Sequence, residues 1–319
     1  MKIGFIGLGN AGGKLAGSLL RKEFDLTVHD LQPAAAKPLL DNGAKWAQTP
    51  RQAAVDADMI ITCLPSPAAS AAVMENADDG VLSGLKANVV WGEMSTTDES
   101  EVRRLGVKVL AAGGQALDCP VSGGCHRAAT GNISIFVGGE RHTFERVLPV
   151  LKAMGRDILH TGGLGSASVL KVLTNYLASA NLVSLCEALV VAKLADMDLN
   201  VAYEAIRISS GNSFVHETES QVILNGSRNI DFTMDLVLKD VSLFQTLADR
   251  IGAPLELSPL LVSIFKDGAA RYGKREWSSN IIRRLEDACN TSVRAPGFPA
   301  QMIDNEPETT GAEVIPNRS

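Results

Sequence analysis

The chain begins with Lys2-Ile-Gly-Phe-Ile-Gly-Leu-Gly-Asn-Ala-Gly12, a short apolar run that leads directly into three glycines spaced as GxGxxG. Leucines then recur at helical spacing up to Leu20, and a second predicted strand, 25–29, ends at Asp30. Strand, glycine turn, helix, strand and acidic residue follow one another as in a dinucleotide-binding βαβ unit. We therefore predict an α/β protein with an N-terminal Rossmann domain built on a doubly wound sheet.

The glycines of this turn have separate roles. Gly7 permits the tight turn, Gly9 lets the backbone approach a pyrophosphate, and Gly12 lets helix and strand pack closely. The following helix N-terminus attracts the negative phosphates. The predicted phosphate contacts are therefore Gly7, Leu8, Gly9, Asn10, Ala11 and Gly12.

Asp30 bears on the choice of cofactor. Its carboxylate can accept hydrogen bonds from the adenosine ribose hydroxyls and would repel a 2′-phosphate. NAD is therefore favoured over NADP.

Two further strands end in polar loops, as expected for a doubly wound domain. The run 59–64 stops at Leu64-Pro65, and the run 88–94 is followed by hydroxyl residues that include Thr96. Ligands bind where parallel strands end, so these loops are candidate cofactor contacts. Ordinary helix capping is the alternative on pattern alone.

Ser122, Gly123 and Gly124 form a bend after the predicted strand at 115–119. Consecutive backbone N–H groups and a hydroxyl in such a bend suit a carboxylate or another anion. A flexible bend that binds nothing remains the alternative.

Residues 162–196 carry the second major signal. No Gly or Pro occurs from Ser166 to Asp196, and the segment is almost uncharged, which predicts one long helix buried on all sides. Lys171 and Asn175 stand one turn apart, and a buried lysine carries a desolvation cost. A membrane span is disfavoured because polar residues interrupt the segment. The alternative of a core helix whose lysine side chain extends to water is left open.

The rest of the chain shows helical spacing without strands, at 201–209, 234–251, 259–272 and 279–288. Lys239 lies on one of these helices, one turn from Asp235, and a solvated ion pair would explain that spacing. After Asn290 the composition turns polar, so a loose tail is expected. The predicted domains are 1–161 for NAD binding, 162–290 as an all-helical domain entered by the long interdomain helix 162–196, and a flexible tail, 291–319.

Composition restricts the partners. The 319 residues carry a formal net charge of −6, which disfavours nucleic acid and anionic membranes. The five cysteines lack any CxxC pair and are expected to be neither disulfides nor metal ligands. Met1 leads directly into the first strand, so we expect a cytoplasmic protein. The apolar helix predicts a homodimer or homotetramer.

Four motifs together resemble the β-hydroxyacid dehydrogenase family, whose members include 3-hydroxyisobutyrate dehydrogenase and tartronate semialdehyde reductase. The resemblance covers about residues 1–290, and the motifs occur in the family's order. They are the glycine turn 7–12, the segment Asp118-Cys-Pro-Val-Ser-Gly-Gly124, the stretch from Gly162 through Lys171 and Asn175, and Lys239-Asp240.

The resemblance implies a role for each matching residue. Lys171 would be the catalytic acid/base, Asn175 and the Ser122–Gly124 bend substrate contacts, and Lys239 a contact to the nicotinamide and its ribose. Leu64, Pro65 and Thr96 match cofactor contacts. Arg127 departs from the family, which usually has a glycine there; a cation near the substrate could meet a second anionic group, or the side chain could point outward.

The implied activity is NAD-dependent interconversion of a small 3-hydroxy carboxylate and its semialdehyde or keto form. Two alternatives remain. One is a relative that acts on a different acidic substrate, such as a decarboxylating or a semialdehyde-reducing enzyme. Among such relatives, 6-phosphogluconate dehydrogenases are longer than this chain, and imine reductases, which share the architecture, typically lack the lysine. The other is a catalytically inactive Rossmann binding module, which the presence of Lys171 disfavours.

Overall fold

The structure is a computed structural model that describes residues 1–316. The chain forms two compact units. The sheet unit contains Met1–Lys171 together with the described residues from Asp304 onward, and the helical unit contains Val172–Ile303. The first unit thus extends ten residues past the predicted boundary at 161, and it also includes the C-terminal segment of the chain.

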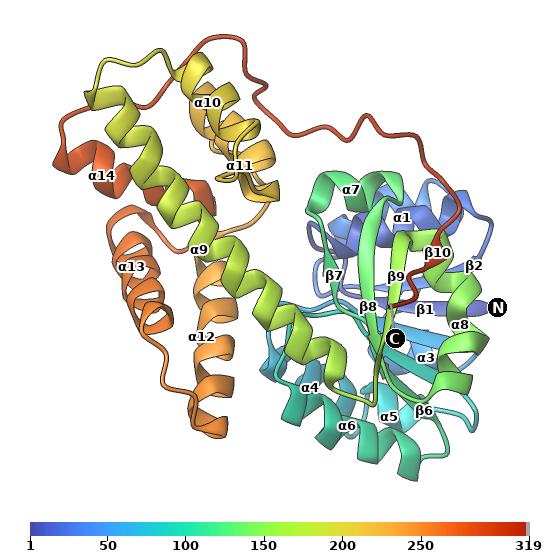
Figure 1. The fold of residues 1–319 in the computed structure, drawn as a ribbon. Helices are drawn as coiled ribbons and strands as arrows, with labels where there is room; N and C mark the ends of the chain where they lie inside the picture. The colour runs from blue at the N-terminus through green and yellow to red at the C-terminus, as the bar shows by residue number, and fades with distance from the viewer. Residues whose placement is uncertain (317–319) are drawn as a thin grey trace. The chain divides into compact units, whose positions relative to one another are not determined.

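The sheet unit is built on one ten-stranded sheet in the order β10-β9-β8-β6-β5-β4-β1-β2-β3, with β7 paired to β8 (Figure 1). The pairs from β3 to β6 are all parallel, and β8 runs antiparallel to β6 and to β7. The strands are β1 (Lys2–Ile6), β2 (Asp25–His29), β3 (Lys45–Trp46), β4 (Met59–Thr62), β5 (Val90–Glu93), β6 (Gln115–Asp118), β7 (Val121–Ser122), β8 (Ile133–Gly138), β9 (Gly155–Gly162) and β10 (Ala312–Glu313).

Helices cover both faces of this sheet, which confirms the doubly wound prediction (Figure 1). Successive residues of a strand point to opposite faces. In β4, Met59 and Ile61 accordingly enter one buried cluster, and Ile60 enters the other. The connecting helices are α1 (Gly12–Arg21), η1 (Pro33–Ala36), α2 (Lys37–Leu40), α3 (Pro50–Ala54), α4 (Pro67–Glu75), α5 (Val81–Gly84), α6 (Glu99–Ala111), α7 (Cys125–Thr130) and α8 (Arg141–Met154).

The helical unit confirms the predicted all-helical region. Its helices pack around one buried cluster that includes Leu189, Ile223 and Phe265. Helix α9 (Ser166–Leu194) begins in the sheet unit and continues into this one. The others are α10 (Leu199–Arg207), α11 (Phe214–Asn225), α12 (Met234–Ile251), α13 (Leu257–Tyr272), η2 (Ser278–Ile282) and α14 (Arg283–Ala288).

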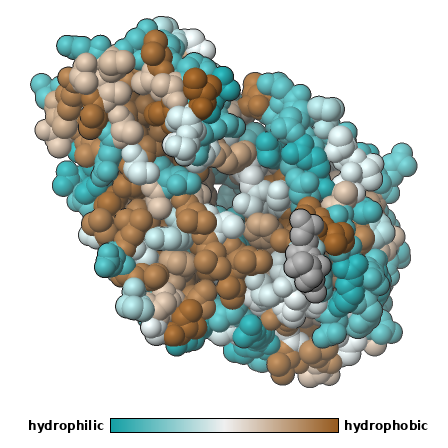
Figure 2. Space-filling view, in the orientation of Figure 1, coloured by the Kyte–Doolittle hydropathy of each residue, from teal (hydrophilic) through white to brown (hydrophobic). Residues whose placement is uncertain are grey.

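The prediction that α9 is buried on all sides is wrong for the single chain. Leu177 is 56% exposed and Val191 is 65% exposed, while Leu189, on the opposite side, is completely buried. Figure 2 shows hydrophobic residues gathered on the surface of the helical unit. By length and composition alone, α9 could also cross a membrane, a property that core helices of soluble proteins share. The unit is too small to cover an apolar helix on every side.

The predicted loose tail also differs from the structure, as far as Pro316. Val293 is fully buried and its N–H donates to Glu286 at 2.7 Å, and Ala295 donates to the Leu224 carbonyl at 3.0 Å. Further on, β10 pairs with β9, and the N–H of Val314 donates to the Ile158 carbonyl at 2.8 Å. Backbone hydrogen bonds and buried apolar side chains order a segment whose composition is polar. The predicted tail residues 317–319 lie outside the described residues.

Glu219 on α11 provides a pH-dependent prediction. Its Oε2 is buried and has no hydrogen-bond partner among the described residues, and burial raises the pKa of Glu219 to about 8. A carboxyl group with a raised folded-state pKa favours folding below its unfolded pKa of about 4.5 and loses that contribution as pH rises through about 8. We expect Glu219→Gln to stabilise the protein by about 1–2 kcal/mol at pH 8.5 and by less at pH 6.

Thermal unfolding of wild type and Glu219→Gln from pH 5 to pH 9 measures this difference. Glu217→Gln is the matched control, because Glu217 lies on the same helix and is exposed. Parallel pH profiles for wild type and Glu219→Gln would contradict the prediction.

Candidate functional site

The carboxyl ends of β1, β4, β5 and β6 lie at one edge of the sheet. Strand β1 pairs with β2 on one side and with β4 on the other, so the chain changes direction across the sheet beside β1. Open α/β sheets bind ligands at such a switch point. Gly7 directly follows β1, and Leu64 follows the end of β4. The structure therefore brings these two predicted cofactor contacts to the same place.

The glycine turn shows why each glycine is needed. Gly7 has φ +96°, and a Cβ on it would lie 2.3 Å from the carbonyl oxygen of Cys63. A Cβ on Gly12 would lie 2.1 Å from the carbonyl oxygen of Gly7. A Cβ on Gly9 would have no heavy atom of the described chain within 4 Å. Two glycines thus serve internal packing, and the third faces open space that a pyrophosphate can occupy.

Asp30 is held beside this turn. The Leu8 N–H donates to Asp30 Oδ2 at 2.7 Å, and the Gln32 N–H donates to Oδ1 at 2.8 Å. A carboxylate oxygen can accept more than one hydrogen bond, so both oxygens keep capacity for ribose hydroxyls. The residues of the turn and its acidic partner together fit a dinucleotide.

A buried carboxylate connects the next two loops. The Leu64 N–H donates to Ser95 Oγ at 2.7 Å, and the Ser95 N–H donates to Glu93 Oε1 at 2.9 Å. The Ser95 hydroxyl also donates to Glu93. Burial raises the pKa of Glu93, and the hydrogen bonds from Ser95 oppose this shift. This network orders the loops that carry Pro65 and Thr96. Sequence reasoning missed it, although an acidic residue at the end of the apolar strand β5 could have indicated it.

The Ser122–Gly124 bend has the backbone conformation that its glycines suggest. Gly123 has φ +123° and Gly124 has φ +87°. Side chains other than hydrogen are strained in this region of φ, so the sequence needs glycine at both positions. Ser122 pairs with Ser134 of β8 on one side of the bend, and α7 begins directly after it.

Asp118 links the bend to the start of α9. It is completely buried, and it lies four residues before Ser122. Its Oδ1 accepts from the Gly165 N–H at 2.8 Å, while its Oδ2 accepts from the Ser168 N–H at 2.7 Å and from the Ser168 hydroxyl at 2.9 Å. Burial raises the pKa of Asp118, and these bonds oppose the shift.

The consequence concerns Lys171. A carboxylate at a helix N-terminus stabilises the free N–H groups and the helix dipole. Ser168 lies three residues before Lys171, which is 8% exposed. Asp118 therefore fixes the first turn of the helix that carries the predicted catalytic lysine. In the sequence alone, Asp118 is distinguished only as the first residue of a motif.

In the helical unit, Asp240 joins two predicted site residues. Asn175 Nδ2 donates to Asp240 Oδ2, and Lys239 Nζ lies 2.7 Å from Asp240 Oδ1. Asp240 is only 2% exposed. Asp235, the partner that helical spacing suggested for Lys239, bonds to Arg275 at 3.2 Å. Asn175 also lies one turn after Lys171 on α9.

Arg127 lies beside the bend and also contacts the C-terminal segment. A Cβ on Gly123 would lie 3.4 Å from Arg127 Cδ, so the arginine side chain passes next to the bend. Its guanidinium pairs with Glu306 at 3.1 Å. The five N–H donors of a guanidinium allow a second anion besides this carboxylate.

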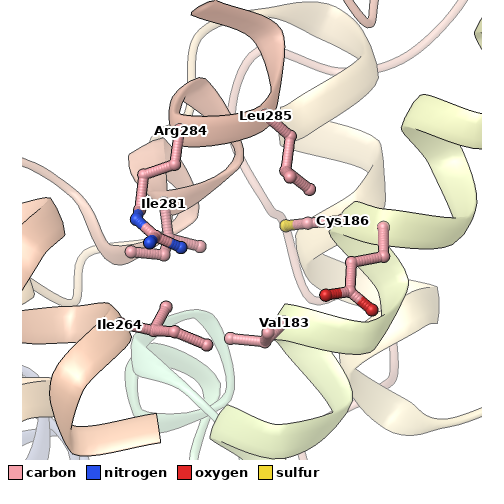
Figure 3. A pocket seen from close by; sticks show the side chains of 7 residues that line it. Val183, Cys186, Ile264, Ile281, Arg284 and Leu285 are labelled. Carbon is pink, nitrogen blue, oxygen red and sulfur yellow. The ribbon is translucent and has the colours of Figure 1, made fainter. Parts of the chain in front are cut away.

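A small cavity in the helical unit contains none of these residues. It has a volume of about 20 Å³, enough for about one water molecule. Figure 3 shows side chains of α9, α13, η2 and α14 around it, including Cys186 and Arg284. It is too small to be the site of a substrate.

Known proteins match the chain along most of its length. A family model for the NAD binding domain of 6-phosphogluconate dehydrogenase matches residues 2–162. A second one, for the NAD-binding domain of NADP-dependent 3-hydroxyisobutyrate dehydrogenase, matches residues 165–285. The chain is 33% identical to 2-(hydroxymethyl)glutarate dehydrogenase of Eubacterium barkeri over 92% of its own length and 97% of that protein. It is 30% identical to 3-sulfolactaldehyde reductase of Escherichia coli, over 87% of this chain and 93% of that one.

Solved structures agree with the sequence matches. A 3-hydroxyisobutyrate dehydrogenase from Salmonella typhimurium superimposes with a TM-score of 0.81 at 28% identity, covering 88% of this chain and 99% of that one. The enzyme of that name from Mycobacterium tuberculosis, solved with L-serine, gives a TM-score of 0.78 at 25% identity, covering 89% and 98%. With its nicotinamide-binding sheet unit, its all-helical unit and these relatives, the chain belongs to the β-hydroxyacid dehydrogenase family.

Proposed function

We propose that the protein uses NAD to interconvert a small 3-hydroxy carboxylate and its semialdehyde or keto form. One observation carries the proposal. The buried carboxylate of Asp118, which precedes the anion-binding bend, also holds the first turn of the helix that carries Lys171. Asp118 thus connects two features: a bend that suits a carboxylate, and the helix that carries a buried lysine.

The chemistry follows from these residues. The bound nicotinamide supplies hydride transfer. Ser122, Gly123 and Gly124 would bind the substrate carboxylate and so fix the position of the neighbouring hydroxyl. Lys171 would take the hydroxyl proton during oxidation and return it during reduction. Asn175 and Lys239 keep the roles of substrate contact and cofactor contact that the resemblance implies.

Arg127 would select the substrate. The name of one relative specifies a substrate with two acidic groups, a glutarate, and the name of another specifies a sulfonate as the acidic group. A guanidinium beside the bend suits such a group, because charge-assisted hydrogen bonds to carboxylates and sulfonates are strong. We therefore propose a substrate with a second anionic group.

A substrate screen tests both the reaction and this selection. NADH formation is measured with a panel of 3-hydroxy acids that carry a carboxylate, a sulfonate, a hydroxyl or no further polar group. We expect turnover to favour the doubly anionic acids, and Arg127→Ala to lower kcat/KM for them by about 10- to 100-fold, the loss of one charge-assisted contact. No NADH with any acid would contradict the reaction, and an unchanged ranking in Arg127→Ala would contradict the role of Arg127.

Asp30 is proposed to select NAD. Because its carboxylate would repel a 2′-phosphate, we expect Asp30→Ser to lower the ratio of kcat/KM with NAD to that with NADP by about tenfold or more. Asp25→Asn is the matched control, since Asp25 begins β2, which Asp30 directly follows, and pairs with Lys45 at 2.6 Å. An unchanged ratio in Asp30→Ser would show that Asp30 does not select the cofactor.

We also propose that the protein acts in the cytoplasm as a homodimer or homotetramer. The exposed apolar side chains of α9, Leu177 and Val191 among them, support an interface that a second copy covers. A monomeric mass in light scattering would contradict this assembly.

A further inference from the structure

The C-terminal segment of the sheet unit carries acidic residues at every second position: Asp304, Glu306 and Glu308. Residues two apart lie on one side of an extended chain. All three side chains contact the same neighbourhood, which consists of α7, the residues directly after it, the end of α1 and the start of β9. We call residues 304–308 the acidic strap.

Helix α7 lies directly after the Ser122–Gly124 bend and has only six residues. A helix this short is not stable by itself and depends on tertiary contacts. One apolar residue, Ala128, is completely buried, which provides little hydrophobic stabilisation. The position of α7, and with it the far side of the bend, therefore depends on polar contacts.

The acidic strap supplies these contacts at the carboxyl end of α7. Asp304 accepts hydrogen bonds from the Thr130 hydroxyl and from Asn132 Nδ2, the latter at 2.8 Å. Asn132 Nδ2 also donates to the Glu306 carbonyl at 3.1 Å, and Asn132 is fully buried. Burial alone would raise the pKa of Asp304, but these bonds hold it below its usual value.

Glu306 and Glu308 extend the same arrangement. Glu306 pairs with Arg127 of α7 at 3.1 Å and also with Arg156 of β9. Glu308 pairs with Lys22 at 3.1 Å and lies 3.6 Å from Arg21. Arg21 in turn donates to the Ala129 carbonyl of α7 at 2.9 Å. The acidic strap thus connects α7 to β9, because Glu306 pairs with an arginine of each. It connects α7 to α1 through Arg21, which contacts both Glu308 and a carbonyl of α7.

We propose that the acidic strap positions the substrate-binding bend. Asp304 and Glu306 act through α7, so they are positioning residues that contact neither substrate nor cofactor. The inference rests on the proposed function, because it takes the Ser122–Gly124 bend as the carboxylate site. It assigns a role to a segment that lies beyond the part of the chain matched to the two family models.

The test compares two variants of the full chain. Asp304→Asn/Glu306→Gln removes both charges with little change in shape. Glu313→Gln is the matched control, because Glu313 lies on the same C-terminal segment but pairs with Arg141 of α8. Hydrogen exchange of residues 121–132 is measured without any ligand, and KM is measured separately for the hydroxy acid and for NAD.

The double variant should exchange amide hydrogens in 121–132 about tenfold faster than wild type, since local opening becomes easier. Its KM for the hydroxy acid should rise about fivefold or more, with KM for NAD within about twofold, and the control should match wild type in all three measurements. Unchanged exchange, an unchanged KM for the hydroxy acid, or equal rises in both KM values would each overturn the proposal. Absence of turnover in wild type would overturn the proposed function alone, because the exchange measurement needs no substrate.

Discussion

Replacing Lys171 with alanine is expected to lower kcat by about 1,000-fold or more, the contribution typical of a positioned acid/base. Affinity for NAD should stay within about twofold, because the proposed role of the lysine is at the substrate hydroxyl and not at the cofactor. Lys171 is nearly buried near the start of α9, where Asp118 fixes the preceding turn. Stopped-flow measurement of NADH formation gives the rate, and calorimetric titration with NAD gives the cofactor affinity.

Lys193→Ala is the matched control for this prediction. Lys193 lies in the last turn of the same helix and is exposed. The control should keep full activity. Turnover of Lys171→Ala within about tenfold of wild type would exclude Lys171 as the acid/base.

Gly9→Val is expected to weaken NAD binding by about 100-fold or more without weakening the fold, since close approach of the backbone to the pyrophosphate needs a glycine. The added side chain would meet no atom of the described chain near its Cβ, so it would occupy the space that faces the ligand. Calorimetric titration with NAD measures the affinity, and the melting temperature reports the fold.

Gly12→Val provides the contrast within the same turn. A Cβ there would lie 2.1 Å from a backbone oxygen, so the strand and helix must move apart. Overpacking of this kind costs about 1–3 kcal/mol or more, and the melting temperature should fall by several degrees. Tight NAD binding by Gly9→Val, or equal melting temperatures for the two variants, would contradict the division of roles among the glycines.

Local sequence signals were sufficient to predict an element where its residues have a single physical reason to be there. The glycines at 7, 9 and 12, the alternation of apolar runs and the helix without breaks from Ser166 each predicted an element that the structure contains. Helix α11 was missed. Thr218 and Ser220 are buried on it together with Val222, so polar residues occur on its buried side as well as on its exposed side, and its hydrophobic periodicity is weak.

The contacts between distant parts of the chain could not be predicted in this way. Asp118 and Glu93 are ordinary acids in the sequence, and their role becomes visible only when Gly165, Ser168 and Ser95 are brought to them. The polar composition of the tail predicted disorder, because composition does not report the basic side chains of α1, α7 and β9 that the tail meets.

By itself, the sequence determined the Rossmann fold, the all-helical second region and the family, and it predicted which residues would carry the chemistry. These properties depend on backbone conformation and on hydrophobic periodicity, which are local. The tertiary structure decided that a buried aspartate joins the Ser122–Gly124 bend to the helix of Lys171, that α9 leaves an apolar side exposed, and that the acidic strap contacts α7. The contacts of Asp118 and of the acidic strap join residues more than 40 positions apart in the chain, and only the folded chain brings such residues together.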